Sequence, residues 1–369
     1  MTLALVHSEG LVQAEVRGRL GVLTLKRPQA LNALSLGMIR DVTTALLAWQ
    51  EDPAIAAVLV RGATQEGKGV AFCAGGDIRF FHQAALAGDP RLEDFFTEEY
   101  RLNHLIHQYR KPYVALMDGI VMGGGMGISQ GAAVRVVTER TKMAMPETNI
   151  GLFPDVGGGW FLARCPGRVG EFLALSGQVL AAGDAIGWGL ADVYLPSGEL
   201  EAYTEALATA SGHGGAAVLE VARGRGHPAP AAQLAMQRPV IDRCFDATDV
   251  PAIYRALDVD GSDWALSVLA ALRKRSPLMQ AVTLEQVRRA RGMTLAQDLR
   301  MERDLVRNCF HLRPGAASET VEGIRALAVD KDHAPRWNPH TIEEVTAQMV
   351  QAFFRSPWPT HAHPLRDLT

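Results

Sequence analysis

The chain has 369 residues, of which 48% are hydrophobic and 21% are charged, a balance typical of a globular protein with a sizeable core. Its formal net charge of −3 gives no electrostatic case for binding nucleic acid or an anionic membrane. The opening residues "MTLALVHSEG" lack a basic segment followed by a long apolar core, so we expect no signal peptide, and no apolar run reaches the length of a membrane span.

The first 150 residues alternate predicted strands with predicted helices. Residues 11–25 alternate apolar and polar side chains about a glycine-containing turn, which predicts a hairpin. Residues 36–53 have the spacing of an amphipathic helix, and residues 55–62 form a buried strand. Further predicted elements are a helix over 96–111, a strand over 112–119, a short helix after the glycines at 123–125, and strands over 133–139 and 141–147. This alternation predicts an α/β fold.

Strand signals become rare after about Pro196. Residues 208–233 are rich in Ala, Gly and Pro and fit either a linker or loosely capped helices. Amphipathic helical patterns dominate from Val250 onward, as in residues 283–292 and 295–312. We therefore predict a mixed core over residues 1–200 and a mostly helical C-terminal region over residues 201–369.

The cysteines and histidines do not indicate a metal centre. The cysteines are far apart and show no metal-type pairing. They are Cys73, Cys165, Cys244 and Cys309. His104 and His107 are three residues apart on a predicted helix, but no third ligand accompanies them. We expect buried thiols in a reducing cytosol, a cytoplasmic protein and no bound metal.

The segment "GATQEGKG", residues 62–69, follows a predicted strand and matches part of a phosphate-binding loop. The Ser or Thr that would hold magnesium is replaced by Gly69, and the next residues do not open a helix. We interpret the segment as a surface loop.

Two glycine-rich turns offer exposed backbone N–H groups. In "FCAGGDIRFF", Gly75 and Gly76 precede Asp77, which is suited to cap a following helix. In "MDGIVMGGGMGIS", three glycines separate a strand from a helix, without the spacing of a dinucleotide fingerprint. Tight turns or close packing would also explain these glycines. Two such turns together favour a two-donor oxyanion hole.

Two carboxylates occupy an apolar, glycine-rich segment, "MPETNIGLFPDVGGGW". Glu147 and Asp155 have no Lys or Arg within this segment to neutralise them. Apolar burial raises the pKa of a carboxyl, and a neighbouring carboxylate raises it further. Such groups suit acid, base or nucleophilic work at a carbonyl. Combined with the glycine turns, they indicate acyl or enolate chemistry; no Gly-x-Ser-x-Gly motif supports a serine triad.

These motifs together resemble the enoyl-CoA hydratase/isomerase, or crotonase, superfamily. The segments that carry the resemblance are "KRPQALNALS", "FCAGGDI", "GGGMGIS" and "MPETNIGLFPDVGGG". Four more, "TEEYRLN", "KPYVALMDGIVMGGG", "RSPLMQAVTLEQVRRA" and "VEGIRALAVDKDHAPRWNP", resemble a hydrolase subgroup, so the likeness covers nearly the whole chain. The resemblance implies a spiral of ββα units followed by helices.

The resemblance also implies a role for each candidate residue. The N–H groups of Gly76 and Gly124 would form the oxyanion hole for a thioester carbonyl. Glu147 would be the main catalytic carboxylate, and Asp155 a second acid or orienting group that also contacts substrate. Glu99 would bind the polar end of the substrate. Coenzyme A enters as part of an acyl-CoA substrate, so no separate cofactor is expected.

One departure from the hydratase pattern favours hydrolysis. Hydratases typically carry a Glu at the position of Gly127, which here has no side chain. The implied reaction is cleavage of a short 3-hydroxyacyl-CoA, with 3-hydroxyisobutyryl-CoA from valine breakdown as the expected substrate. An enoyl-CoA hydratase or isomerase using Glu147 alone is the alternative, and a catalytically silent acyl-CoA-binding protein is a third. Hydratase relatives usually form trimers, whereas the helical C-terminal region here can instead cover its own site, so a homo-oligomer stays open.

Overall fold

The computed structural model describes residues 3–65, 67 and 69–369. Internal contacts divide the chain into two compact units, each assembled from three segments of sequence. The first contains residues 1–76, 101–144 and 179–233, and the second contains residues 77–100, 145–178 and 234–369. The segments of the two units alternate along the chain. The predicted division into a mixed core over residues 1–200 and a helical region over residues 201–369 stays a prediction.

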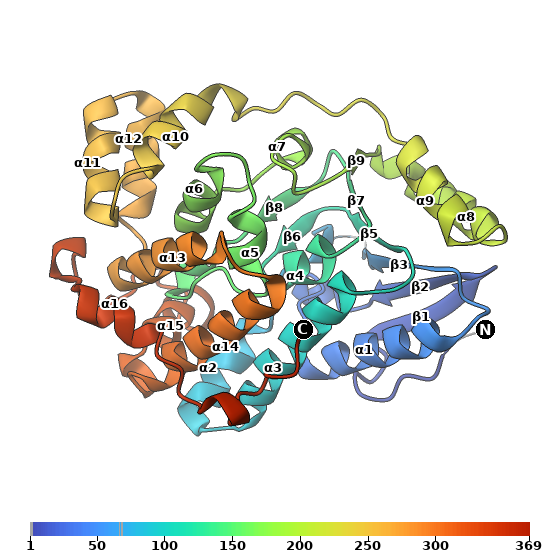
Figure 1. Ribbon diagram of the computed structural model, residues 1–369, viewed down its shortest axis with the longest axis horizontal. Helices are drawn as coiled ribbons and strands as arrows, with labels where there is room; N and C mark the ends of the chain where they lie inside the picture. The colour runs from blue at the N-terminus through green and yellow to red at the C-terminus, as the bar shows by residue number, and fades with distance from the viewer. Residues whose placement is uncertain (1–2, 66, 68) are drawn as a thin grey trace. The chain divides into compact units, whose positions relative to one another are not determined.

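The first unit contains two sheets (Figure 1). β1 (Val12–Arg17) and β2 (Leu20–Leu25) form the predicted antiparallel hairpin, and every other strand pair is parallel. The six-stranded sheet has the order β1-β2-β3-β5-β7-β9, and the three-stranded sheet has the order β4-β6-β8. The remaining strands are β3 (Ala57–Gly62), β4 (Ala71–Cys73), β5 (Tyr113–Met117), β6 (Ile120–Met122), β7 (Val134–Val137), β8 (Lys142–Ala144) and β9 (Val193–Tyr194). Each of β3, β5 and β7 is followed by a strand of the smaller sheet, so one strand-pair step repeats three times.

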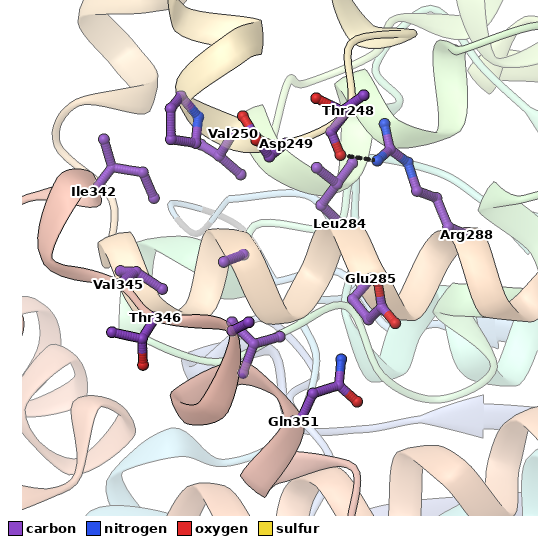
Figure 2. A pocket seen from close by; sticks show the side chains of 14 residues that line it. Thr248, Asp249, Val250, Leu284, Glu285, Arg288, Ile342, Val345, Thr346 and Gln351 are labelled. Atoms are coloured by element: carbon purple, nitrogen blue, oxygen red, sulfur yellow. Dashed lines mark hydrogen bonds between the residues drawn. The ribbon is translucent and has the colours of Figure 1, made fainter.

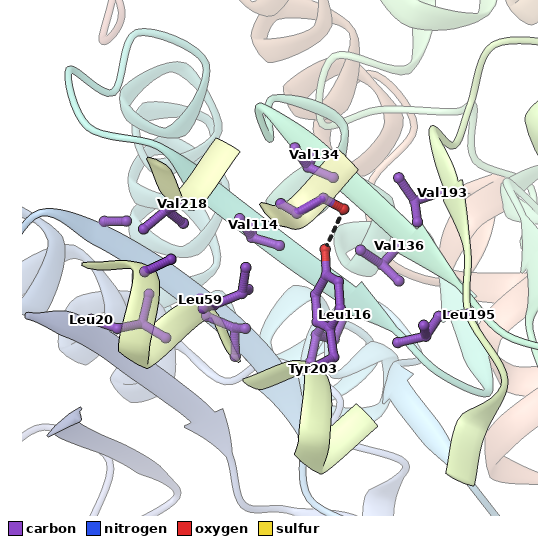
Figure 3. Packing of buried hydrophobic residues seen from close by; sticks show 14 of the residues in the cluster. Leu20, Leu59, Val114, Leu116, Val134, Val136, Val193, Leu195, Tyr203 and Val218 are labelled. Atoms are coloured by element: carbon purple, nitrogen blue, oxygen red, sulfur yellow. Dashed lines mark hydrogen bonds between the residues drawn. The ribbon is translucent and has the colours of Figure 1, made fainter. Parts of the chain in front are cut away.

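Helices cover both faces of the six-stranded sheet. α1 (Leu36–Glu51) begins at Ser35, whose hydroxyl accepts the Met38 N–H, and packs against β1 and β2. On the other face, buried side chains of β2, β3, β5 and β7 pack against α8 (Leu200–Ser211) and α9 (Gly215–Gly224), as Figure 3 shows. The Tyr203 hydroxyl donates to the Ala222 carbonyl at 2.8 Å and ties α8 to α9. The Ala- and Gly-rich segment for which two interpretations were open therefore contains the end of α8 and the whole of α9.

The second unit is built from helices. α13 (Pro277–Ala290) packs against α5 (Gly158–Leu162), α6 (Val169–Ser176) and α16 (Ala347–Phe353). The other helices of this unit are α2 (Ile78–Ala87), α10 (Arg238–Phe245), α11 (Val250–Asp260), α12 (Asp263–Leu272), α14 (Leu295–His311) and α15 (Glu319–Ile324). Helices α4 (Gly124–Gln130) and α7 (Ala182–Gly187) belong to the first unit, and α3 (Arg91–His107) passes from the second unit into the first.

The structure moves several predicted boundaries: the strand predicted over 141–147 is β8 and ends at Ala144, so Glu147 lies outside it, and the start of α3 shifts as well. α3 begins at Arg91 rather than at residue 96, because the Asp89 carboxylate accepts the Arg91 N–H at 2.9 Å and two acids, Glu93 and Asp94, stand in the first turn. The predicted cap at Asp77 is confirmed, since its carboxylate accepts the Phe80 N–H. Among the described residues, no helix is both long and apolar enough to span a membrane.

Candidate active site

The two glycine turns lie next to each other in the first unit. Gly75 has a φ of +105°, and a Cβ at this position would lie 3.5 Å from the Gly124 nitrogen and 3.2 Å from the Met122 carbonyl oxygen. Only glycine readily combines this backbone conformation with so close an approach. Gly124 is the first residue of α4, so its N–H has no carbonyl acceptor within the helix. The turns that carry Gly76 and Gly124 are thus brought together, as an oxyanion hole requires.

The three candidate carboxylates lie together in the second unit. Glu99 lies on α3, Glu147 is the first residue of a single 3₁₀ turn that ends at Ile150, and Asp155 lies on the irregular segment before α5. All three side chains are buried. Glu99 Oε1 and Glu147 Oε2 are buried without a hydrogen-bond partner among the described residues. Orphaned buried oxygens are costly unless a ligand or water satisfies them, so both are available to a substrate.

Burial raises the pKa values of all three acids, and neighbouring charges raise those of Glu147 and Glu99 further. Burial raises the pKa of Glu147 well above its ordinary value, and the nearby Asp155 charge raises it further. The pKa of Glu99 is also raised well above normal, first by burial and then by the charges of Asp155 and Glu147. The pKa of Asp155 rises to about 6, mainly through burial. Carboxyls in such an environment can hold or accept a proton near neutral pH, which general acid–base chemistry requires.

Tyr100 is a site residue that the sequence reasoning missed. Its hydroxyl donates to Asp155 Oδ2 at 2.8 Å, and both side chains are buried. The hydrogen bond favours the ionised carboxylate and lowers the pKa of Asp155 against the effect of burial. The sequence did contain a signal for this residue, because Tyr100 directly follows Glu99 in "TEEYRLN". Only the acid of that motif was a candidate from sequence.

α14 holds the segment that carries Asp155. The Glu302 carboxylate accepts the N–H groups of Gly157 at 2.7 Å and Gly159 at 2.9 Å, and Asp298 accepts the Trp160 N–H at 2.9 Å. Both acids are fully buried. Neither was a candidate from sequence, because "LAQDLRMERDLVRNCFHL" shows only an amphipathic helix and the bonded partners lie far away along the chain.

A family model described as enoyl-CoA hydratase/isomerase matches residues 20–354. The chain belongs to the enoyl-CoA hydratase/isomerase family. Curated relatives of this family member include mitochondrial 3-hydroxyisobutyryl-CoA hydrolases. The one from Xenopus tropicalis is 42% identical over 344 residues, covering 92% of this chain and 87% of the relative. The one from Homo sapiens is 40% identical over 350 residues, covering 94% and 88%.

Two solved structures are similar over most of the chain. One, described as a carnitinyl-CoA dehydratase from Mycobacterium thermoresistibile, has a TM-score of 0.86 at 38% identity and covers 97% of this chain and 99% of that one. The other, described as an enoyl-CoA hydratase from Rhodobacter sphaeroides 2.4.1, has a TM-score of 0.85 at 35% identity and covers 94% and 98%. They confirm the predicted α/β, crotonase-like fold with its repeated strand pairs and helical C-terminal region.

The predicted cytoplasmic location of this family member is wrong, because the curated relatives are named as mitochondrial proteins. The prediction depended on cysteines that show no paired spacing. Free cysteines indicate a reducing environment but do not distinguish one reducing compartment from another. All four cysteines are buried, as predicted.

The structure divides the predicted site residues of this family member between its units. Gly76 and Gly124 belong to the first, and Glu99, Glu147 and Asp155 belong to the second. The phosphate-loop-like segment has two residues, at positions 66 and 68, outside the described part of the chain, and its defining lysine is one of them. Within the described part, no three His, Cys, Asp or Glu side chains are arranged to hold a metal ion.

A pocket of about 320 Å³ lies between α11, α13 and α16, apart from every predicted site residue (Figure 2). Its charged side chains already have protein partners. Arg288 donates to the Thr248 carbonyl at 2.6 Å, Asp249 caps α11 by accepting the Ala252 N–H, and Glu285 accepts from Arg289. These bonds are all made within the protein, and nothing among the described residues of the pocket links it to the predicted site residues.

Proposed function

We propose that this chain hydrolyses the thioester of a short 3-hydroxyacyl-CoA, with 3-hydroxyisobutyryl-CoA as the preferred substrate and valine breakdown as the pathway. The products are the free acid and coenzyme A. The names of the curated relatives, at 40–42% identity over more than nine-tenths of the chain, support this proposal.

The single observation that carries the proposal is the buried Glu147 carboxylate with its unpartnered Oε2, beside Asp155 and Glu99. Burying a carboxylate oxygen without a partner is costly, and such perturbed acids are concentrated at functional sites. Glu147 is the central catalytic group. Asp155, held by Tyr100, is the second acid, and it steers a water or bonds the hydroxyl of the acyl group.

Gly76 and Gly124 supply the oxyanion hole in this proposal. Their N–H groups stabilise the negative charge that develops on the thioester oxygen as it becomes tetrahedral. The unpartnered Glu99 Oε1 accepts a hydrogen bond from the polar end of the acyl group. A site that binds the hydroxyl of the acyl group disfavours an acyl group without this hydroxyl, because a buried acceptor would then be left unpaired.

The alternative is hydration of an enoyl-CoA, which the descriptions of the two similar solved structures favour. Against it stands Gly127, a buried residue of α4 with no side chain at the position where hydratases typically hold a second acid. In the proposed hydrolase, Asp155 supplies the second acid from a different segment of the chain.

An assay of free thiol release across a panel of acyl-CoA thioesters tests the proposal. We expect rapid release from 3-hydroxyisobutyryl-CoA, slower release from isobutyryl-CoA, which lacks only the hydroxyl, and no hydration of crotonyl-CoA. Rapid hydration of crotonyl-CoA without thiol release would establish the alternative. Binding of acyl-CoA without either reaction would identify a silent binding protein.

The proposed reaction needs no metal and no cofactor beyond the coenzyme A of the substrate. Turnover that survives extensive dialysis against a chelator is the expected result. Assembly into a homo-oligomer stays a prediction, which light scattering of the purified protein tests.

A further inference from the structure

The backbone next to Asp155 is strained. Val156 has a φ of +56° and Gly157 a φ of +85°, so two successive residues occupy the left-handed region. Glycine tolerates this conformation, whereas a β-branched side chain such as that of Val156 does not. Strained residues persist only where the surrounding structure holds them, and they concentrate at functional sites.

Glu302 holds this turn through both of its carboxylate oxygens. Its two carboxylate oxygens accept the N–H groups of Gly157 and Gly159, across 145 and 143 positions of sequence. Gln286 joins the same network, because its Nε2 donates to the Pro154 carbonyl at 2.7 Å and to Glu302 Oε1 at 3.1 Å. Asp155 thus lies between two anchored points, Pro154 on one side and Gly157 on the other.

Stability alone does not explain this arrangement. Glu302 is fully buried, and burial raises its pKa well above the ordinary value. The charges of two more acids, Asp298 and Asp155, raise this pKa further. An apolar side chain would avoid the desolvation and the repulsion, but it could not accept two backbone N–H groups. We therefore interpret Glu302 as a residue that sets the geometry of the turn.

We propose that Glu302 is a positioning residue for Asp155: by accepting the Gly157 and Gly159 N–H groups, it fixes the strained turn that directs the Asp155 carboxylate to Tyr100 and the acyl group. This inference rests on the proposed catalytic role of Asp155. Glu302 itself does not touch the reacting atoms.

The test compares Glu302→Gln with Glu285→Gln, a matched control that changes a half-exposed acid of the same unit paired with Arg289. The side-chain amide in Glu302→Gln keeps one acceptor oxygen but places its NH₂ group against the second backbone N–H, so one of the two hydrogen bonds is lost. We expect kcat for thiol release to fall on the order of 10²-fold, as misplacement of a reacting group does, with KM nearly unchanged. The control should keep wild-type values. Glu302→Asp, which retains both acceptors on a shorter arm, should lie between them.

A double-mutant cycle separates positioning from general damage. In an Asp155→Asn background, Glu302→Gln should change kcat less than about threefold, because the group it positions is already disabled. Equal losses in both backgrounds would overturn the proposal, and so would a wild-type kcat in folded Glu302→Gln.

Amide hydrogen exchange gives a readout that does not need activity. In Glu302→Gln the peptide containing Gly157 and Gly159 should exchange faster, while α1 should exchange as in the wild type. Unchanged exchange at the turn would show that Glu302 does not hold it, and it would overturn the proposal. If Glu302→Gln does not fold, Glu302→Asp carries the same measurements. A wild-type protein that releases no thiol from any acyl-CoA would instead contradict the proposed function, and the exchange result would still decide the anchoring.

Discussion

The phenol of Tyr100 donates a 2.8 Å hydrogen bond to Asp155 Oδ2, across 55 positions of sequence. Both groups are buried, and the carboxylate that accepts the bond lies beside two further acids. Burial favours the neutral acid, whereas the phenol favours the ionised one, and the pKa of Asp155 settles at about 6. The hydrogen bond therefore favours the ionised form of Asp155 against the effect of burial.

We expect Tyr100→Phe to shift the pH dependence of turnover. Loss of the donor raises the pKa of Asp155 above about 6, so the ionised form is present only at higher pH, and the acid limb of kcat moves upward. A pH–rate profile of thiol release measures the shift. Tyr254→Phe is the control, because it removes a partly buried hydroxyl bonded to Gln280, and it should leave the profile unchanged. An identical acid limb in wild type and Tyr100→Phe would contradict the role assigned to this bond.

The buried acids should make the folded protein less stable as pH rises. The pKa of Asp155 rises from 3.8 unfolded to about 6 folded, so between these values the folded chain binds more protons than the unfolded chain. Stability then falls with increasing pH. Above about pH 6 the loss from Asp155 alone is about 3 kcal/mol, at about 1.36 kcal/mol per pKa unit. Glu147, whose pKa is also raised, extends the loss to higher pH.

Asp155→Asn and Glu147→Gln should therefore lose less stability with rising pH than the wild type. Thermal unfolding followed by circular dichroism at about pH 5 and pH 8 measures the difference. Glu147→Gln should abolish thioester cleavage while remaining folded, and Asp155→Asn should impair it strongly. Parallel decreases of Tm with pH in all three proteins would show that these carboxyls do not titrate abnormally.

We expect Gly124→Pro to reduce turnover on the order of 10²–10³-fold, because proline removes the N–H proposed to stabilise the oxyanion. Gly124 is the first residue of α4, the helical position at which proline is best tolerated, so the variant should fold. Circular dichroism checks the fold, and thiol release measures kcat. A folded variant with normal turnover would falsify the donor assignment.

The mode of action of Glu147 can be resolved with ¹⁸O-labelled water. Its buried carboxylate, in which Oε2 is unpartnered, favours direct attack on the thioester carbonyl, which gives a mixed anhydride that water then opens. In single-turnover hydrolysis with enzyme in excess, water attack on the Glu147 side of the anhydride labels the enzyme carboxyl. Peptide mass spectrometry should find labelled Glu147, or hydroxylamine should trap an acyl-enzyme. Absence of both would favour general-base activation of water instead.

Local sequence was enough to predict the elements whose physics is local. The hairpin of β1 and β2 follows from period-two alternation about a turn, and α1 follows from helical spacing with Ser35 as its cap. Glu147 could be singled out as well, because an acid within an apolar segment is conspicuous whatever surrounds it in space. The family motifs likewise lie in contiguous segments and needed no structure.

Tertiary structure alone decided which groups act on those acids. The hydroxyl of Tyr100 reaches Asp155 across 55 positions, and Glu302 reaches Gly157 across 145, so neither bond leaves a periodic pattern in the sequence. On α14, Glu302 lies three residues from both Leu299 and Leu305, so helical spacing places it on the buried face, but only the tertiary structure shows that it accepts the Gly157 and Gly159 N–H groups. Hydrogen bonds between distant segments depend on how the chain folds back on itself, which is why composition and spacing could find the acids but not their partners.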